Sequence, residues 1–507
     1  MFHAAQLVLL GLVAGLVYAL HRRRTLDPRE PPGVGSRIPV LGHLLGMLWY
    51  GLPYFRIATE NCAHPICTLD LLFNKTYVVK SPPLLQAVQR NRKTLSFDPF
   101  LSLTLERMAG IHGPTLEQFR EKESGGQGLG HEVILAMQSA LTGRPLDRMN
   151  ACMARKLRPW VDELAGLPTI DLDRWCRRVI TAASTDASYG PLNPYQDPRI
   201  EDALWKFESH ISPLLANVLP WLTARTAWRG RETAVAAFIK YYELGGHQQG
   251  SELTYVRWKS MHDAGVPLEH IARQEVAMGL GLLSNSVPAT FWVLYDLYSR
   301  PDLLAEIRQE MRDQVLRVDA DHRHIIDISA LRDQCPLLLS TFQEVLRLRS
   351  ATAPTRVVMQ DTVLAEQYLL KAGSVVNMPG AAIGRAADAW GSSADTFDPR
   401  RFLKTTQNPR RTGGFMSFGV SPVICPGRHF ASSEILALAA MLVLRFDLVP
   451  VAGVWQEPSI NSKAIASTMG PPKHGFNVRV CPRTEYAGVA WDFEVKEGTG
   501  MFNLMVG

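Results

Sequence analysis

The stretch "FMSFGVSPVICPGRHFASSEILALAAMLVL", Phe415 to Leu444, decides what this chain can fold into and what chemistry it can hold. A turn-prone loop precedes Cys425, and Pro426 and Gly427 then open a helix whose apolar residues recur at helical spacing. A cysteine at that junction faces the free N–H groups of the helix. Because those groups favour a thiolate, we expect the pKa of the Cys425 thiol to be lowered.

The segment alone leaves three interpretations of Cys425 open. A thiolate is a nucleophile, and His429, one helical turn further on, would be its base. A thiolate is also a soft axial ligand for iron. The third interpretation is a buried structural cysteine without chemistry.

The spacing around Cys425 favours the iron ligand. Four residues fit most of the haem-binding signature F-x-x-G-x-x-x-C-x-G-x-x-x-A, namely Phe418, Cys425, Gly427 and Ala431. In this signature the chain resembles the cytochrome P450 superfamily. Two positions depart from the pattern, because Ser421 replaces the second glycine of the loop and Val423 replaces a common basic residue. These departures affect the turn and one contact to a haem propionate, but not the ligand.

A second motif of the same superfamily lies upstream in "STFQEVLRLRSATAPTR", where Glu344 and Arg347 match its E-x-x-R helix motif. Three residues apart on a helix, they share a face and can pair. The resemblance implies a third partner in a P-x-R-F loop, which "TFDPRRF" supplies as Arg401. The same likeness makes Arg356 a partner for a haem propionate, since a bidentate arginine suits a carboxylate. The tryptophan and arginine that many members carry on an early helix are not identifiable here.

The third motif is "GLLSNSVPATFW" at 281–292, which aligns with the oxygen-activating turn of the superfamily. Asn285 stands where the family usually has an acid, and Ser286 stands where it has a threonine. Pro288 removes a backbone donor and frees a carbonyl near Ser284, which predicts a local distortion of the helix. The resemblance makes Asn285 and Ser286 the catalytic pair, with the Ser286 hydroxyl passing protons. The alternative is that both residues only line a kinked core helix.

The resemblance covers nearly the whole chain and predicts a mainly α fold with a small β part. The runs "ICTLDLLF" and "TYVVK" predict an early β hairpin, residues 84–350 are mostly helical by apolar period, and a last long helix is predicted near 427–446. Within the superfamily, the motifs look closest to the branch that contains cholesterol 7-alpha-hydroxylase and prostacyclin synthase. Fungal secondary-metabolite P450s carry similar cysteine loops.

The N-terminus predicts a membrane anchor. The run from Ala4 to Leu20 has Gln6 as its one strongly polar residue, and three arginines follow it at 22–24. This order favours an uncleaved transmembrane helix with the rest of the chain in the cytosol, whereas a short core helix is the alternative. We therefore expect an anchor at 1–21, a Pro/Gly-rich hinge at 22–42 and a P450 catalytic domain at 43–507.

Composition narrows the possible partners. The chain has 507 residues, 46% apolar and 20% charged, with a formal net charge of +6. So small an excess of positive charge in a chain of this length argues against a surface that binds nucleic acid. The seven cysteines are scattered without a C-x-x-C pair, so they predict neither a disulfide framework nor a zinc site.

The residues and the resemblance together predict a membrane-anchored haem-thiolate monooxygenase that carries haem b, lies in the endoplasmic reticulum membrane and oxidises a small hydrophobic substrate. No G-x-G-x-x-G follows a strand, so electrons would come from an NADPH-cytochrome P450 reductase, with cytochrome b5 as a second donor. The predicted pocket walls are 97–113, 281–286, 351–355 and 461–470. The alternatives are an isomerase or dehydratase that needs no external electrons, a silent haem or lipid carrier, and a thiol hydrolase.

Overall fold

The computed structural model describes residues 13, 27–36, 38, 41–71, 74–120, 128–403, 414–462, 464–498 and 500–505. The predicted anchor, apart from residue 13, and part of the predicted hinge lie outside these residues. One described helical stretch, Leu268–Tyr298, is long and apolar enough to cross a membrane, but 72% of its most apolar window is buried inside the protein. It is therefore a core helix, and the anchor stays a prediction.

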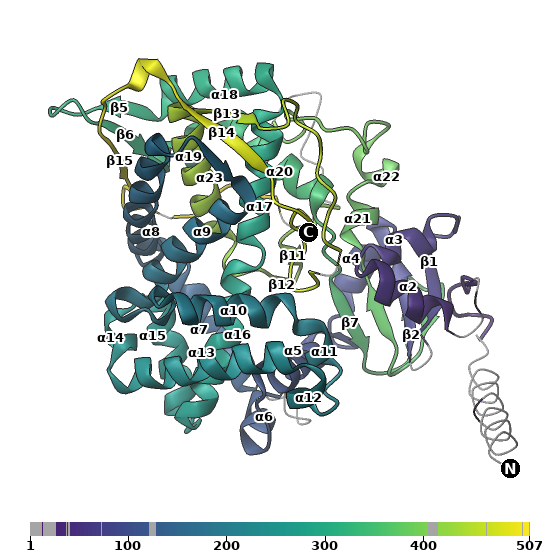
Figure 1. Ribbon diagram of the computed structural model, residues 1–507. Coiled ribbons are helices and arrows are strands. Elements are labelled where there is room, and N and C mark those ends of the chain that lie inside the picture. Colours follow the sequence, from purple (N-terminus) through teal and green to yellow (C-terminus); the bar gives the residue numbers. More distant parts are fainter. Residues whose placement is uncertain are drawn as a thin grey trace, which may run out of the picture.

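Helices make up most of the described chain, as predicted (Figure 1). The α-helices are α2 (Gly42–Tyr50), α3 (Tyr54–Thr59), α4 (Pro82–Arg90), α5 (Asp98–Thr104), α6 (Pro114–Phe119), α7 (Leu129–Ala140), α8 (Gly143–Glu163), α9 (Leu172–Tyr189), α10 (Pro198–Ser209), α11 (Ile211–Leu215), α12 (Pro220–Thr223), α13 (Arg225–Glu243), α14 (Gly246–Gln249), α15 (Glu252–Asp263), α16 (Leu268–Leu283), α17 (Ser286–Tyr298), α18 (Pro301–Gln314), α19 (Ile328–Gln334), α20 (Pro336–Arg349), α21 (Gly380–Ile383), α22 (Ala387–Trp390) and α23 (Arg428–Arg445). The predicted last long helix is α23.

The strands are short and form small sheets. They are β1 (Ile66–Asp70), β2 (Lys75–Val79), β3 (Leu95–Ser96), β4 (Thr169–Asp171), β5 (Leu316–Val318), β6 (His324–Asp327), β7 (Thr355–Val358), β8 (Thr362–Leu364), β9 (Tyr368–Leu370), β10 (Val375–Asn377), β11 (Gly419–Val420), β12 (Val423–Ile424), β13 (Phe446–Pro450), β14 (Asn477–Pro482) and β15 (Trp491–Glu494). The predicted hairpin is confirmed, because β1 and β2 pair antiparallel with Ile66 opposite Val79.

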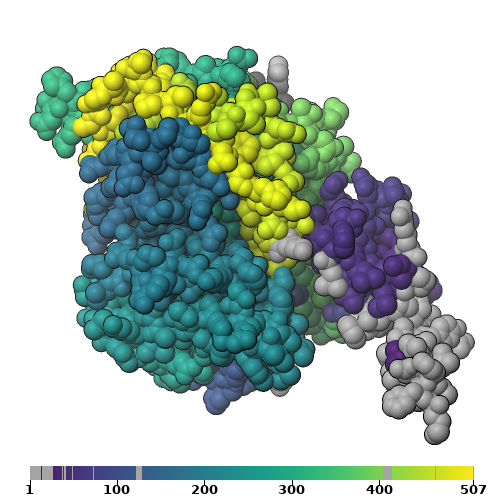
Figure 2. Space-filling model, in the orientation of Figure 1, coloured from purple at the N-terminus to yellow at the C-terminus, as the bar shows by residue number. Residues whose placement is uncertain are grey.

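The largest sheet joins distant parts of the sequence. Its order is β1-β2-β10-β7-β3, so β10 and β7, which follow α20, lie between β2 and β3 from the first hundred residues. This sheet and α2 to α4 form a lobe beside the helical body, which Figure 2 shows in purple and light green next to the blue and teal helices. The lobe brings β7, which carries Arg356, against the loop that precedes α23.

Two helices form the centre of the helical body. Every residue of α17 is buried, and so are fifteen of the eighteen residues of α23 that the structure describes. A helix buried on all sides needs apolar residues around its whole circumference, which the sequences of both helices supply. Because α17 also packs on α9, α20 and α23, the N-terminal end of α17 has a fixed position relative to the cysteine loop.

Candidate active site

The central helix is interrupted where its sequence predicts. Helix α16 ends at Leu283 and α17 begins at Ser286, so that Ser284 and Asn285 form a turn between them. Pro288 has no N–H to donate to the carbonyl of Ser284, and the helix resumes with Ala289 N–H donating to the Asn285 carbonyl at 3.1 Å. The predicted distortion is therefore confirmed.

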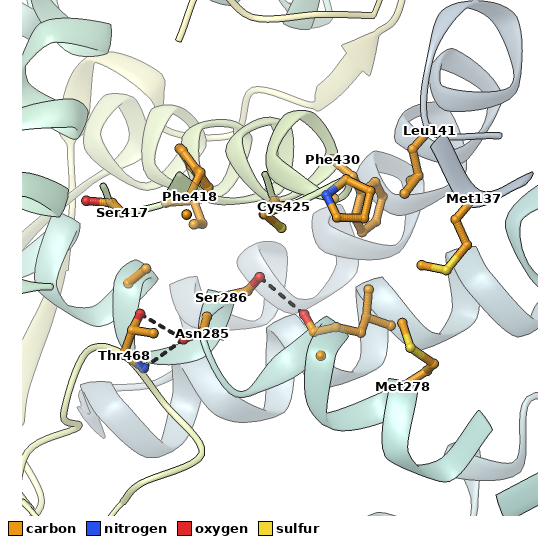
Figure 3. Close-up of a pocket in the computed structure, with 18 of the residues that line it drawn as sticks. Met137, Leu141, Met278, Asn285, Ser286, Ser417, Phe418, Cys425, Phe430 and Thr468 are labelled. Atoms are coloured by element: carbon orange, nitrogen blue, oxygen red, sulfur yellow. Dashed lines mark hydrogen bonds between the residues drawn. The ribbon is translucent and has the colours of Figure 1, made fainter. Parts of the chain in front are cut away.

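The two side chains at this break are held in different ways (Figure 3). Ser286 Oγ donates to the carbonyl of Leu282 at 3.3 Å. Asn285 Oδ1 accepts from the backbone N–H of Thr468 at 2.8 Å and from its hydroxyl at 3.0 Å. The Asn285 oxygen is thus tied to a loop near the C-terminus, whereas the Ser286 hydroxyl still has lone pairs that can accept a hydrogen bond.

The cysteine loop is a tight hairpin that ends at the first turn of α23. Strands β11 and β12 pair antiparallel, and Cys425 N–H donates to the Phe418 carbonyl at 2.8 Å. Gly427 lies directly before the helix, where an added Cβ would lie 3.9 Å from Cys425 Sγ. The loop therefore presents the sulfur to the cavity, and Gly427 places no side chain beside it.

Burial raises the pKa of the Cys425 thiol, and the backbone N–H groups of Gly427 and Arg428 offset only part of that rise. The prediction that the helix terminus lowers this pKa is therefore wrong for the thiol by itself. In a site surrounded by protein the desolvation of the thiolate outweighs a few N–H dipoles, whereas a coordinated metal ion deprotonates a thiol outright. Cys425 suits a metal ligand better than a free nucleophile.

His429 does not act on Cys425. Its ring is buried, its Nδ1 accepts from the backbone N–H of Phe502 at 3.1 Å, and burial lowers its pKa to about 4. No hydrogen bond joins His429 to Cys425 within the described chain. The geometry therefore gives the thiol hydrolase no support, and His429 instead fixes the C-terminal segment on α23.

A cavity of about 390 Å³ separates Cys425 from the helix break. Figure 3 shows Cys425, Phe418 and Phe430 on one side of it and Asn285 and Ser286 on the other. Most of the lining is apolar, which is typical of a cofactor or small-molecule site. A Cβ on Gly281 would meet only the Met278 side-chain end, so the helix leaves room there.

The lining agrees only in part with the predicted walls. The central helix, Thr352 and the Thr468–Met469 pair line the cavity, whereas no residue of 97–113 does. Sequence reasoning missed the lining that comes from α7 and the residue after it, α9, α15 and α20, namely Met137, Leu141, Ser188, Tyr189, Leu253, Arg257, Phe342 and Leu346. The apolar period of these helices shows that they have a buried face, but not that this face borders a cavity.

The structure brings Glu344, Arg347 and Arg401 together. Arg347 forms two hydrogen bonds with the Glu344 carboxylate, at 2.7 and 2.8 Å, and Arg401 Nε lies 3.1 Å from each of its oxygens. The Glu344 and Arg347 side chains are fully buried. Arg401 also donates to the carbonyls of Ser393 and Thr396. The cluster joins α20 to the segment that leads toward the cysteine loop.

Arg356 is a buried cation without a carboxylate partner among the residues that the structure describes. Its guanidinium donates to the carbonyls of Thr355 at 2.8 Å and Val420 at 3.3 Å, beside the cysteine hairpin. Burial lowers its pKa, and the charge of Asp98 offsets this only in part. A buried guanidinium without a carboxylate partner favours an anionic ligand that can accept two parallel hydrogen bonds from it.

These features fit haem. A cysteine sulfur at one wall suits its iron, an apolar cavity suits its porphyrin, and the unpaired Arg356 beside the hairpin suits a propionate. The fold and the site therefore define a haem-thiolate protein.

Comparisons with known proteins agree. Residues 263–478 match the sequence profile of the family described as Cytochrome P450. The chain is 41% identical over 506 residues to "Cytochrome P450 monooxygenase nodJ" of Hypoxylon pulicicidum, with 97% of each chain covered. It is 26% identical to a cytochrome P450 monooxygenase of Gibberella zeae, covering 96% of each chain. It is 23% identical to cytochrome P450 7B1 of Mus musculus, covering 87% of this chain and 90% of that one.

This chain belongs to the cytochrome P450 family. The fold also matches the solved structure "Retinoic acid bound cyanobacterial CYP120A1" with a TM-score of 0.71 at 19% identity, covering 90% of this chain and 99% of that one. The predicted resemblance, fold class and haem cofactor are confirmed, and the chain is an enzyme of the P450 monooxygenase family, whose members generally need a redox partner and a hydrophobic substrate. A silent carrier has no support.

Proposed function

We propose that this chain is a membrane-anchored monooxygenase that inserts one oxygen atom from O2 into a small hydrophobic substrate of terpenoid, sterol or polyketide type. The observation that carries the proposal is the Ser286 hydroxyl across the cavity from Cys425, beside the break in the central helix. Haem, when bound, supplies the binding and reductive activation of dioxygen. The relatives described as fungal P450 monooxygenases support a role in secondary-metabolite or lipid biosynthesis.

Each proposed site residue has one task. Cys425 holds the iron, Phe418 and Gly427 shape the loop around it, and Arg356 binds a propionate. Glu344 and Arg347 on α20 bind Arg401, and this cluster holds α20 against the segment that leads toward the cysteine loop.

At the break, Ser286 holds the proton that the reaction consumes, and Asn285 fixes the Thr468 loop. The apolar lining excludes water and selects an apolar substrate.

The proposed membrane location rests on the N-terminal apolar run and on exposed apolar side chains. Trp49 on α2 is 77% exposed, and Leu222 on α12 is 68% exposed, next to Trp221. Large apolar side chains exposed in groups favour contact with a lipid surface. We therefore propose a catalytic domain at 43–507 that lies on the cytosolic face of the endoplasmic reticulum, after an anchor at 1–21 and a hinge at 22–42.

The direct test is reconstitution of the full chain in phospholipid vesicles with NADPH-cytochrome P450 reductase, with and without cytochrome b5. A sterol, a diterpenoid and an aromatic polyketide serve as probes under isotopically labelled dioxygen. A product that carries one labelled oxygen and depends on NADPH supports the proposal. Products that form without reductase and NADPH contradict it.

One observation favours a second candidate, a P450 isomerase or dehydratase that uses no external electrons. At the break of the central helix, Asn285 has an amide where the resemblance expects an acid. The oxygen of this amide already accepts two hydrogen bonds from Thr468. Conversion of a hydroperoxide probe without NADPH would identify this activity, whereas the retained Ser286 hydroxyl favours the monooxygenase.

A further inference from the structure

After β15 the chain crosses the helical body behind the cysteine loop. Residues 500–505, which we call the C-terminal segment, have no regular secondary structure, yet their backbone is bound at two points. Phe502 N–H donates to His429 Nδ1 on α23 at 3.1 Å, and Met505 N–H donates to Gln343 Oε1 on α20 at 2.8 Å. The segment thus joins the helix that follows the cysteine loop to the helix that carries the E-x-x-R motif.

The C-terminal segment is part of the core of the protein. The side chains of Phe502 and Met505 are buried in the main hydrophobic cluster, and their acceptors His429 and Gln343 are buried as well. The Nε2 atom of His429 has no hydrogen-bond partner among the residues that the structure describes. Without the segment, neither ring nitrogen of His429 would have one, and an unpaired buried polar group is destabilising. The His429 ring therefore depends on the segment that covers it.

His429 lies in the first turn of α23, directly after the residues that face the cysteine sulfur. This turn is closed by Ala431 N–H, which donates to the Gly427 carbonyl at 2.9 Å. The backbone N–H groups of Gly427 and Arg428, in the same turn, act on the Cys425 sulfur and favour its thiolate. A contact that holds the His429 ring therefore also holds these N–H groups in position.

The C-terminal segment contacts this turn from the side that faces away from the cavity. Gly427, Phe430 and Ala431 line the cavity, whereas neither His429 nor any described residue of the segment does. The segment therefore lies outside the space that a substrate would occupy. It can act on a cofactor in the cavity only through the position of α23.

We propose that the C-terminal segment holds the first turn of α23 in place and so fixes the N–H groups that face the Cys425 sulfur. His429 and Phe502 are the positioning residues of this contact. Hydrogen bonds to a ligating sulfur reduce the electron density that it gives to the metal, so they raise the reduction potential. The contact therefore sets this potential and keeps the sulfur on the iron. The inference rests on the proposed role of Cys425 as the iron ligand, but not on the reaction.

Amide hydrogen exchange of the haem-loaded full chain tests the contact without turnover. His429→Phe keeps an aromatic ring but has no acceptor, so exchange of the amides at 427–431 should be about 10-fold faster, with α17 unchanged. His429→Asn keeps an acceptor near the position of Nδ1 and should restore slow exchange. Met501→Ala is the matched control, since Met501 precedes Phe502 but is 43% exposed. Exchange at the wild-type rate in His429→Phe overturns the proposal.

The reduction potential of the haem iron is the second readout, because a contact that only stabilises the fold would not change it. We expect a more negative midpoint potential in His429→Phe with full haem content, and wild-type values in His429→Asn and Met501→Ala. In the reduced carbon monoxide complex of His429→Phe, the red-shifted Soret band should decay about 10-fold faster on warming. An unchanged potential and decay rate overturn the proposal.

Gln343→Met decides the question if His429→Phe does not retain haem. This substitution removes the acceptor of Met505 on α20 and leaves α23 intact. Faster exchange at 427–431 supports the proposed contact, and wild-type exchange overturns it. If the Soret band survives Cys425→Ala, the proposed iron ligand is wrong, whereas the exchange measurement still decides whether the segment holds the turn.

Discussion

Thr468 donates two hydrogen bonds to the side-chain oxygen of Asn285, from its backbone N–H at 2.8 Å and from its hydroxyl at 3.0 Å. The two residues are 183 positions apart. The contact fastens a loop near the C-terminus to the break in the central helix, so the side chain at position 285 links the helix break to one wall of the cavity.

Asn285→Ala should release this loop. We expect a loss of about 1 to 3 kcal/mol in the free energy of unfolding, because two donors of Thr468 lose their acceptor. Binding of an apolar ligand, measured by optical titration of the haem-loaded protein, should weaken. Asn285→Asp keeps an acceptor oxygen at the Oδ1 position and is the matched control, so equal loss in both variants would contradict this role.

Glu344→Gln should disturb the fold more than any nearby surface change. The substitution leaves the buried Arg347 guanidinium without its negatively charged partner, and breaking a buried pair costs about 3 to 5 kcal/mol. Thermal unfolding and haem content per chain are the measurements. Arg400→Ala removes an exposed ion pair with Glu306 one residue from Arg401 and should change stability by less than about 1 kcal/mol. Similar losses of stability in the two variants would show that the buried cluster contributes no more to folding than an exposed ion pair.

Arg356→Leu separates cofactor binding from folding. Because Arg356 forms no ion pair with any described residue, the haem-free protein should be as stable as wild type or more so, while the haem should dissociate about 10-fold faster or more. Haem transfer to an acceptor protein gives the rate, and thermal unfolding gives the stability. A variant that retains haem as well as wild type would remove Arg356 from the propionate site.

Stability should depend on pH through Glu434, a buried acid on α23. Its pKa is raised from 4.5 to about 8 in the folded protein, so the folded state binds more protons than the unfolded state between these values. The stabilisation is therefore full below about pH 4.5 and is lost as the pH rises through 8. Between pH 6 and 9 we expect wild type to lose roughly 3 kcal/mol more than Glu434→Gln. Parallel pH profiles of the two proteins would contradict a buried neutral acid.

The parts of the site that the sequence predicts are those encoded within a few residues. The cysteine loop, the E-x-x-R pair and the proline-linked helix break each follow from a short pattern, because turn formation and helical spacing act locally. The early hairpin is predicted for the same reason.

What the sequence leaves out depends on contacts between distant segments. Thr468 meets Asn285 and Ser184 meets Glu434 only after the helices have packed, and no short pattern marks either pair. The pKa of Cys425 was predicted in the wrong direction because burial is a property of the whole fold. One signal for Glu434 was present, since it is the single acid in the long apolar helix after the cysteine loop.

The most direct test of the account is the optical spectrum of the purified protein, reduced under carbon monoxide. A cysteine thiolate on the haem iron should give the red-shifted Soret band of a haem-thiolate protein, and Cys425→Ala should abolish it. Cys481→Ala, which removes an exposed cysteine on β14, should leave the band unchanged. A protein that binds no haem, or a band that survives Cys425→Ala, would contradict the central claim.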